Sequence, residues 1–107
     1  AHLKDRFTGE VFWLSREALR VNARLNLRCA SQEAQCVIEK IKERIDSSAL
    51  EVIEKNAAAL KINEIGRVVI KTDRPIAVEK FDFIEELGRF VLERNFNPQG
   101  AGIITAK

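Results

Sequence analysis

Two small sets of side chains in this 107-residue chain have the types needed for chemistry, and the first is a cluster of carboxylates. Asp82, Glu85 and Glu86 lie close together in the sequence, and a pair of such groups can act as general acid and base. Neighbouring carboxylates in a polar segment are more often solvated, because Asp and Glu prefer to be exposed. The single histidine, His2, stands near the start of the chain, and the sequence shows no Ser-His-Asp or Cys-His arrangement around it. We therefore expect no catalytic residue in this chain.

The second set is a pair of thiols. Cys29 and Cys36 flank a polar segment, residues 30–35, so they could face each other across a hairpin and form a disulfide, or supply half of a metal site. A zinc site needs about four ligands at tighter spacing than this chain offers. Disulfides are also uncommon in the cytosol. We predict two reduced, structural thiols and no metal site.

The composition is that of one small domain without a strong electrostatic preference. With 46% hydrophobic residues, the chain can build one modest core. Its 18 basic and 16 acidic residues nearly cancel and are spread along the chain, whereas a nucleic-acid-binding domain usually has a clustered basic face. No segment approaches the roughly 20 apolar residues of a membrane span, and the start lacks the apolar core of a signal peptide. We expect a single cytoplasmic domain over residues 1–107, away from membranes and, since Met is absent even at position 1, excised from a longer polypeptide.

Two segments near the start have the pattern of strands. Residues 7–14 are rich in aromatic and β-branched types, which predicts a strand with Phe7, Val11 and Trp13 toward a core. Trp13 could instead be an anchor for a partner, since Trp is enriched in binding hot spots, but a core position is the simpler interpretation. Residues 23–29 alternate between apolar and polar types, which predicts a second strand.

The remaining segments are partly ambiguous. Residues 67–72 indicate a strand that ends there, because Pro75 cannot donate to a strand ladder, and residues 102–106 indicate a final buried strand. The apolar spacing of residues 36–45 slightly favours a helix, although a strand fits as well. Residues 81–92 have the periodicity of an amphipathic helix. The pattern alone therefore leaves an α+β interaction module open.

Four segments, in their order, resemble the third domain of the elongation factor Tu and elongation factor 1-alpha GTPase family. The resemblance covers most of the chain. It is strongest with the GTPase large subunit of bacterial ATP sulfurylase, because LKINEIG at residues 60–66 is followed by DRPIA at residues 73–77. The segments that carry it are FTGEVFWLS, CVIEKIKERID, LKINEIGRVVIKTDRPIAVEKF, and LGRFVLERN followed by GAGII.

The resemblance implies an all-β fold, a six-stranded antiparallel Greek-key barrel. In such a barrel, residues 36–45 and 88–94 become strands and residues 80–87 a loop, so that tertiary context overrides the helical patterns. Closing the sheet removes exposed strand edges. The side chains expected inside are Phe7, Val11, Leu25, Leu27, Ile41, Val69 and Ile103, and the glycines expected at strand starts and bends are Gly66, Gly88, Gly100 and Gly102.

The resemblance also implies where nucleotide chemistry lies. The chain has no phosphate-binding loop, in which glycines bracket a Lys-Ser or Lys-Thr pair. The family's Asp-x-x-Gly and Asn-Lys-x-Asp motifs are absent too. We therefore expect no cofactor in this domain, with GTP and Mg²⁺ bound by another part of the parent polypeptide.

The implied function is non-catalytic. In the sulfate-activating branch, GTP hydrolysis is coupled to the formation of adenylylsulfate from ATP and sulfate by a separate small subunit. The barrel is then expected to pack against the GTPase domain and second barrel of its own chain and to dock that catalytic small subunit. The alternative is the third domain of a translation factor, which contacts tRNA and needs basic residues on one face.

Four residues are candidates for partner contact. Asn63 and Glu64 lie on a polar turn between apolar segments, where residues are free of packing constraints. In the other interpretation, Asn63 only bonds to backbone at the turn. Arg89 and Arg94 could form a basic rim, although interleaved glutamates favour a solvated face of mixed charge.

Overall fold

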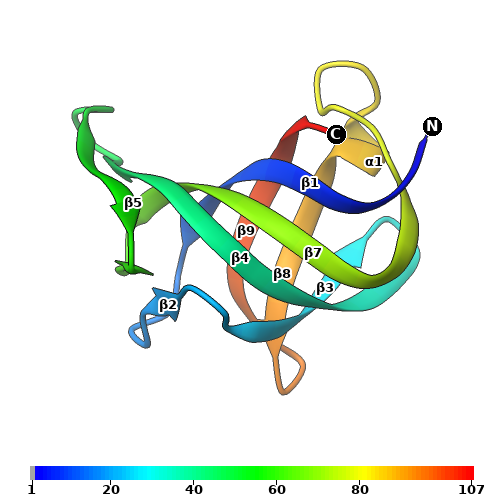
Figure 1. The fold of residues 1–107 in the computed structure, drawn as a ribbon, viewed down its shortest axis with the longest axis horizontal. Helices are drawn as coiled ribbons and strands as arrows, with labels where there is room; N and C mark the ends of the chain where they lie inside the picture. Colours follow the sequence, from blue (N-terminus) through cyan, green and yellow to red (C-terminus); the bar gives the residue numbers. More distant parts are fainter. Residues whose placement is uncertain (1) are drawn as a thin grey trace.

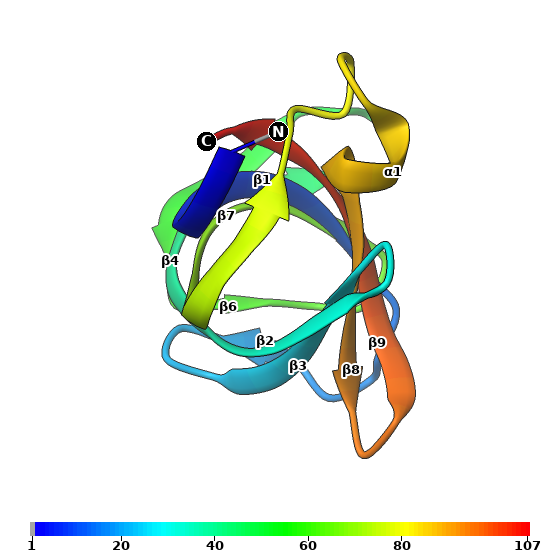
Figure 2. The ribbon, with the colours of Figure 1, turned by 90° about the vertical axis from the view of Figure 1, so that its right-hand side faces the viewer.

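The computed structural model describes residues 2–107, which form antiparallel strands around a single core. The strand order is β3-β8-β9-β1-β7-β4, and an additional pairing between β3 and β4 closes these six strands into a ring. Figure 2 shows this ring, and Figure 1 gives the labels. The predicted six-stranded antiparallel barrel is confirmed. Its elements are β1 (His2–Trp13), β2 (Leu19–Arg20), β3 (Arg24–Cys29), β4 (Gln32–Asp46), β5 (Val52–Ala57), β6 (Ala59–Leu60), β7 (Glu64–Val78), α1 (Glu85–Gly88), β8 (Arg89–Arg94) and β9 (Asn97–Ala106).

Two features lie outside this ring. Strand β5 pairs with the second half of β4, beyond the closed barrel, and ends the strand order. Strands β2 and β6 form a separate two-stranded sheet through Leu19–Leu60 and Arg20–Ala59 pairs. Leu19 and Leu60 are both fully buried, so this small sheet contributes to the core.

The core consists of alternate side chains of the ring strands. Phe7, Val11, Leu25 and Leu27 are buried as predicted, and so is Ile41 on β4. Alternation places every second side chain of a strand inside. Trp13 is fully buried too, and its indole nitrogen donates to the carbonyl oxygen of Glu17 at 2.8 Å. Trp13 is therefore a core residue and not an exposed anchor.

Two predicted core positions are wrong by one residue. On β7 the side chains of Val68 and Ile70 are buried, and Val69 between them is only partly buried. On β9 the buried residue is Ile104, while Ile103 lies on the outer face. Both errors fall in continuous apolar runs, where no alternation indicates which residue points inward.

The two segments with helical periodicity are strands or loop. Residues 36–45 belong to β4, which pairs with β3, β7 and β5. Of the helix indicated over residues 81–92, only the four residues of α1 are helical, and β8 begins at Arg89. The barrel expectation was therefore correct for both segments, except that α1 occupies the end of the expected loop and Gly88, which was expected to begin the strand.

The sequence predicted that this strand ends at residue 72, but β7 does not end there. It continues to Val78 and pairs with β1 on both sides of an irregularity between the pairs Arg6–Lys71 and Lys4–Ile76. Pro75 lies in this irregular part, where it displaces no ladder hydrogen bond. The prediction of an end was wrong because a bulge, and not a terminus, accommodates the proline.

Cys29 and Cys36 do not face each other. The hairpin between β3 and β4 pairs Cys29 with Gln32 and Cys36 with Leu25, so the polar segment is mostly strand and the two thiols lie far along the ladder from each other. Both are buried free cysteines. Burial raises the pKa of Cys29, and it raises the pKa of Cys36 to about 12. The prediction of two structural thiols is confirmed.

The predicted glycines are sites of close packing. A Cβ atom at Gly100 would lie 2.7 Å from the indole ring of Trp13, and one at Gly102 would lie 2.5 Å from the ring of Phe90. Side chains at Gly66 and Gly88 would also collide with neighbours. Gly88, Gly100 and Gly102 need glycine because an adjacent ring or backbone occupies the space of a side chain, whereas the neighbour at Gly66 is the side chain of Leu60.

Candidate docking surface

An apolar row crosses the outer face of the barrel. Cross-strand pairs link one residue from each of six strands, and side chains paired in this way lie on the same face. Phe12 at its centre is 38% exposed, and Val52 at its end is 47% exposed. Ile45 pairs with Ile65 in this row and lies outside the core cluster, but it is only 9% exposed. From β5 to β8 the row is Val52, Ile45, Ile65, Phe12, Ala101 and Val91.

A charged row runs beside the apolar row. Arg67 is at its centre and pairs with Glu43 at 2.6 Å on one side and with Glu10 at 3.1 Å on the other. Alternating charges on adjacent strands attract each other, which fixes these long side chains. The pattern continues to Lys55 at one end. From β5 to β8 this row is Lys55, Glu43, Arg67, Glu10, Ile103 and Arg89.

The two rows meet in a groove at the β1, β8 and β9 side of the barrel. The groove has a volume of about 930 Å³, and its floor includes Phe12, Val91 and Ile103. One wall is the turn between β3 and β4, and the other includes Phe81 from the segment before α1. Apolar side chains from β1, β8 and β9 thus line one open hollow on the barrel surface.

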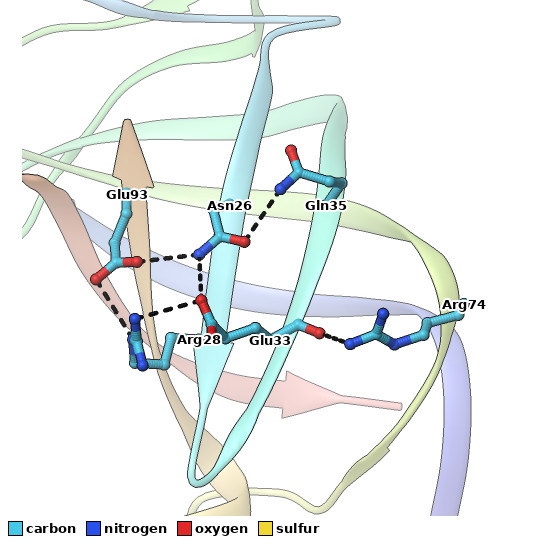
Figure 3. Close-up of polar contacts among 6 residues, drawn as sticks. All are labelled: Asn26, Arg28, Glu33, Gln35, Arg74 and Glu93. Atoms are coloured by element: carbon cyan, nitrogen blue, oxygen red, sulfur yellow. Dashed lines mark hydrogen bonds and ion pairs between the residues drawn. The ribbon is translucent and has the colours of Figure 1, made fainter. Parts of the chain in front are cut away.

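A network of polar side chains covers the neighbouring face of β3, β4 and β8 (Figure 3). The amide nitrogen of Asn26 donates to Glu33 at 3.1 Å and to Glu93 at 3.0 Å, and Gln35 donates to the amide oxygen of Asn26 at 3.2 Å. Arg28 lies between the same two carboxylates, at 3.3 Å from Glu33 and 3.4 Å from Glu93.

This network also links β7 to the hairpin of β3 and β4, and its positive and negative charges lie next to one another. Arg74 donates to the backbone carbonyl of Glu33, as Figure 3 shows. Glu93 is buried although it is charged, which the Arg28 and Asn26 contacts make possible. Because its polar groups bind one another, we assign the network a structural role.

The four predicted contact residues do not come together. Arg89 lies at the end of the charged row and lines the groove. Glu64 accepts two hydrogen bonds from Arg44, at 2.8 and 2.9 Å, so it is held by its own barrel. Asn63 is exposed at a turn with φ of 67°, and its backbone N–H donates to Trp13. Arg94 is at the far end of β8, where it pairs with Glu17 at 2.7 Å.

Sequence reasoning missed the two rows because no segment contains them. Phe12 and Val91 are ordinary outward positions of their strands, and only the register shows that they are neighbours of Ala101. One signal was present in the sequence. Phe12 places a large apolar side chain on the otherwise polar face of residues 7–14. A large exposed apolar side chain can indicate a contact surface.

No metal cluster and no membrane-spanning helix occur in the described part of the chain. Among residues 2–107 there is no group of three or more His, Cys, Asp or Glu side chains placed to hold a metal ion. Within the same residues, no helix is long and apolar enough to cross a bilayer.

Comparison with known proteins identifies the family. Residues 6–105 match the family described as GTP-eEF1A C-terminal domain-like. The chain belongs to this family. In agreement, the fold matches a solved structure of sup35 complexed with GDP, with a TM-score of 0.89 over 97% of this chain and 15% sequence identity.

Curated relatives fall into two groups at similar distance. Elongation factor 1-alpha of Ignicoccus hospitalis is 33% identical over 104 residues, which are 94% of this chain and 23% of that protein. Sulfate adenylyltransferase subunit 1 of Alteromonas mediterranea is also 33% identical over 104 residues, which are 95% of this chain and 22% of that protein. The chain thus spans less than a quarter of these relatives' length. It is a C-terminal domain of a translation-factor-like GTPase family.

Proposed function

We propose that this barrel is the non-catalytic C-terminal domain of a GTP-dependent sulfate adenylyltransferase large subunit. Its outer face, with the apolar row and the groove, packs against the GTPase domain and second barrel of the same polypeptide. The assembled subunit then docks the catalytic small subunit that forms adenylylsulfate. GTP and Mg²⁺ are held by the GTPase domain, and the complex is cytoplasmic.

The observation that carries this proposal is the apolar outer face. An isolated domain that exposes Phe12 and Val52 leaves their apolar surface in contact with water, and a covering domain would remove that contact. Domain interfaces within a chain typically bury roughly 600–1,500 Å² in total. Because the row follows the curved wall of the closed barrel, a covering domain would meet the part of it around Phe12.

The second candidate is the third domain of a translation elongation factor, which the relatives named elongation factor 1-alpha support. Contact with tRNA phosphates requires free basic groups on one face. On this barrel, seven of the 18 basic residues are engaged by carboxylates, which lowers the number free to contact phosphate. The engaged cations are Arg6, Arg28, Arg44, Arg67, Lys71, Arg94 and Lys107.

The two candidates differ in what the parent polypeptide binds. We would purify the parent from its source gene and measure binding to the small catalytic subunit and, separately, to aminoacyl-tRNA at increasing salt. The proposal predicts a stable complex with the small subunit. Binding of aminoacyl-tRNA that weakens steeply with salt, without binding of the small subunit, would assign the domain to translation.

A further inference from the structure

Strand β5 is an open edge of the main sheet. It pairs with β4 on one side, and no strand of residues 2–107 pairs with it on the other. Figure 1 shows β5 standing outside the ring of strands. Residues 52–56 are all exposed, so the backbone N–H and C=O groups of this outer edge are accessible. Such an edge is a template for pairing with another strand.

Both rows of the outer face end at this edge. The apolar row ends at Val52, next to Ile53, which is 46% exposed, and near Leu50, which is 71% exposed. The charged row ends at Lys55, opposite Glu43. Within the described chain, Lys55 has no ion-pair partner, because Glu43 binds Arg67. Val52 and Lys55, the last residues of the two rows, therefore have no paired residue on the open side of β5.

We propose that β5 binds an extended segment of a partner protein as an added antiparallel strand, with an apolar side chain opposite Val52 and a carboxylate opposite Lys55. The charged row alternates from Glu10 through Arg67 and Glu43 to Lys55, so the next group in the alternation is acidic. Backbone hydrogen bonds along the edge supply affinity, and the two side-chain positions supply selectivity.

The register of β5 sets the spacing in the partner. The two rows are two residues apart on β4, at Glu43 and Ile45, but three apart on β5, at Lys55 and Val52, because the pairing is irregular between Arg44 and Ile45. Side chains on one face of a regular strand are two residues apart, so an antiparallel partner presents the carboxylate two residues before the apolar side chain, which then lies opposite the irregular part of β5 at Val52 and Ile53. This irregularity and the charges of the edge deter strands that lack this order.

The neighbouring acidic residue strengthens the preference for a carboxylate opposite Lys55. Glu54 binds Arg44 at 2.9 Å, an arginine that it shares with Glu64. Lys55 is the charged residue of the strand that has no ion-pair partner within the described chain. A basic residue opposite it would be repelled, since like charges directly across a ladder are destabilising.

The test uses the 107-residue chain and two capped synthetic peptides, Thr-Thr-Glu-Thr-Val-Thr and the same peptide with Lys in place of Glu. Amide chemical shifts of the ¹⁵N-labelled chain are followed during titration to millimolar peptide. The glutamate peptide should shift the amides of residues 50–57 and bind about threefold more tightly than the lysine peptide. In Lys55→Glu this preference should reverse. The matched control Lys61→Glu makes the same charge change off the row and should keep the original preference.

Every other pattern of results overturns the proposal. No shift at millimolar peptide, shifts located outside residues 50–57, or equal affinity for both peptides would each contradict it. If Lys55→Glu fails to fold, as shown by its amide spectrum, Lys55→Gln replaces it and should remove the difference between the peptides. A preference that persists in Lys55→Gln would show that Lys55 does not select the partner.

Discussion

The turn between β8 and β9 holds an aromatic residue in a backbone conformation that favours glycine. Asn95 and Phe96 have φ values of 53° and 66°, and they connect the paired residues Arg94 and Asn97. Two consecutive positive φ values define a type I′ turn, in which Asn-Gly is the preferred sequence. Phe96 is 87% exposed, so its ring gains little from packing. This position is therefore strained without a visible compensation in the barrel.

We predict that Phe96→Gly stabilises the barrel. A non-glycine residue in the left-handed region costs about 1–2 kcal/mol, and relief of that strain is partly offset by the larger entropy of glycine in the unfolded chain, about 0.5–1 kcal/mol. The net gain in the free energy of unfolding is up to about 1.5 kcal/mol, which corresponds to a rise in Tm of up to about 12 °C for a domain of this size. Urea unfolding and a thermal melt followed by circular dichroism measure both quantities.

Phe96→Ala is the matched control. It removes the same ring but keeps a Cβ atom, so the strain at φ of 66° remains. We expect its free energy of unfolding to stay within about 0.5 kcal/mol of the original chain. If Phe96→Gly is no more stable than Phe96→Ala, then strain does not set the energetics of this turn and the reasoning is refuted.

Three further predictions concern the barrel itself. Glu64→Gln removes the charge that Arg44 binds through two hydrogen bonds, and should lower the free energy of unfolding by about 1–2 kcal/mol in urea. Burial alone raises the pKa of Glu64, but the bonds from Arg44 and a backbone N–H outweigh it and hold that pKa below its usual range. The stabilisation that ionised Glu64 provides is therefore complete above the usual pKa of about 4.3 and is lost as pH falls through the lower pKa of the folded state. As pH falls below about 4, the free energy of unfolding should therefore decrease less for Glu64→Gln than for the original chain. Gly102→Ala places a Cβ atom 2.5 Å from the ring of Phe90 and should cost about 1–3 kcal/mol, measured by thermal melting. Because burial raises the pKa of Cys36 to about 12, its thiol should react with Ellman's reagent only after unfolding, and rapid reaction in the folded protein would contradict this assignment.

The fold could be predicted from the order of the four segments that resemble the family, and not from the local periodicity of each segment. The periodicity of residues 36–45 and 81–92 favoured helix, because a surface strand with a bulge and a loop with scattered apolar residues can imitate helical spacing. Recognition of the barrel corrected both segments. It could not correct Val69 and Ile103, because strand identity does not determine which residue of an apolar run faces inward.

The candidate surface was harder to predict than the fold. Loop and turn residues such as Asn63 were natural candidates, yet the apolar row consists of outward residues in the middle or at the ends of strands. Its members come from six strands, and they become neighbours only through the register. Register in a closed barrel depends on bulges, such as the one beside Pro75, which no local pattern of the sequence located.

The most direct test of the central claim compares side-chain accessibility in two proteins, this chain alone and its parent polypeptide. Hydroxyl-radical footprinting with mass spectrometry measures oxidation of Phe12, in the apolar row, and of Phe96, at the exposed turn, as an internal reference. If the outer face packs against the other domains, oxidation of Phe12 relative to Phe96 should fall severalfold in the parent. An unchanged ratio would show that this face stays open to solvent and would contradict its role as the docking surface.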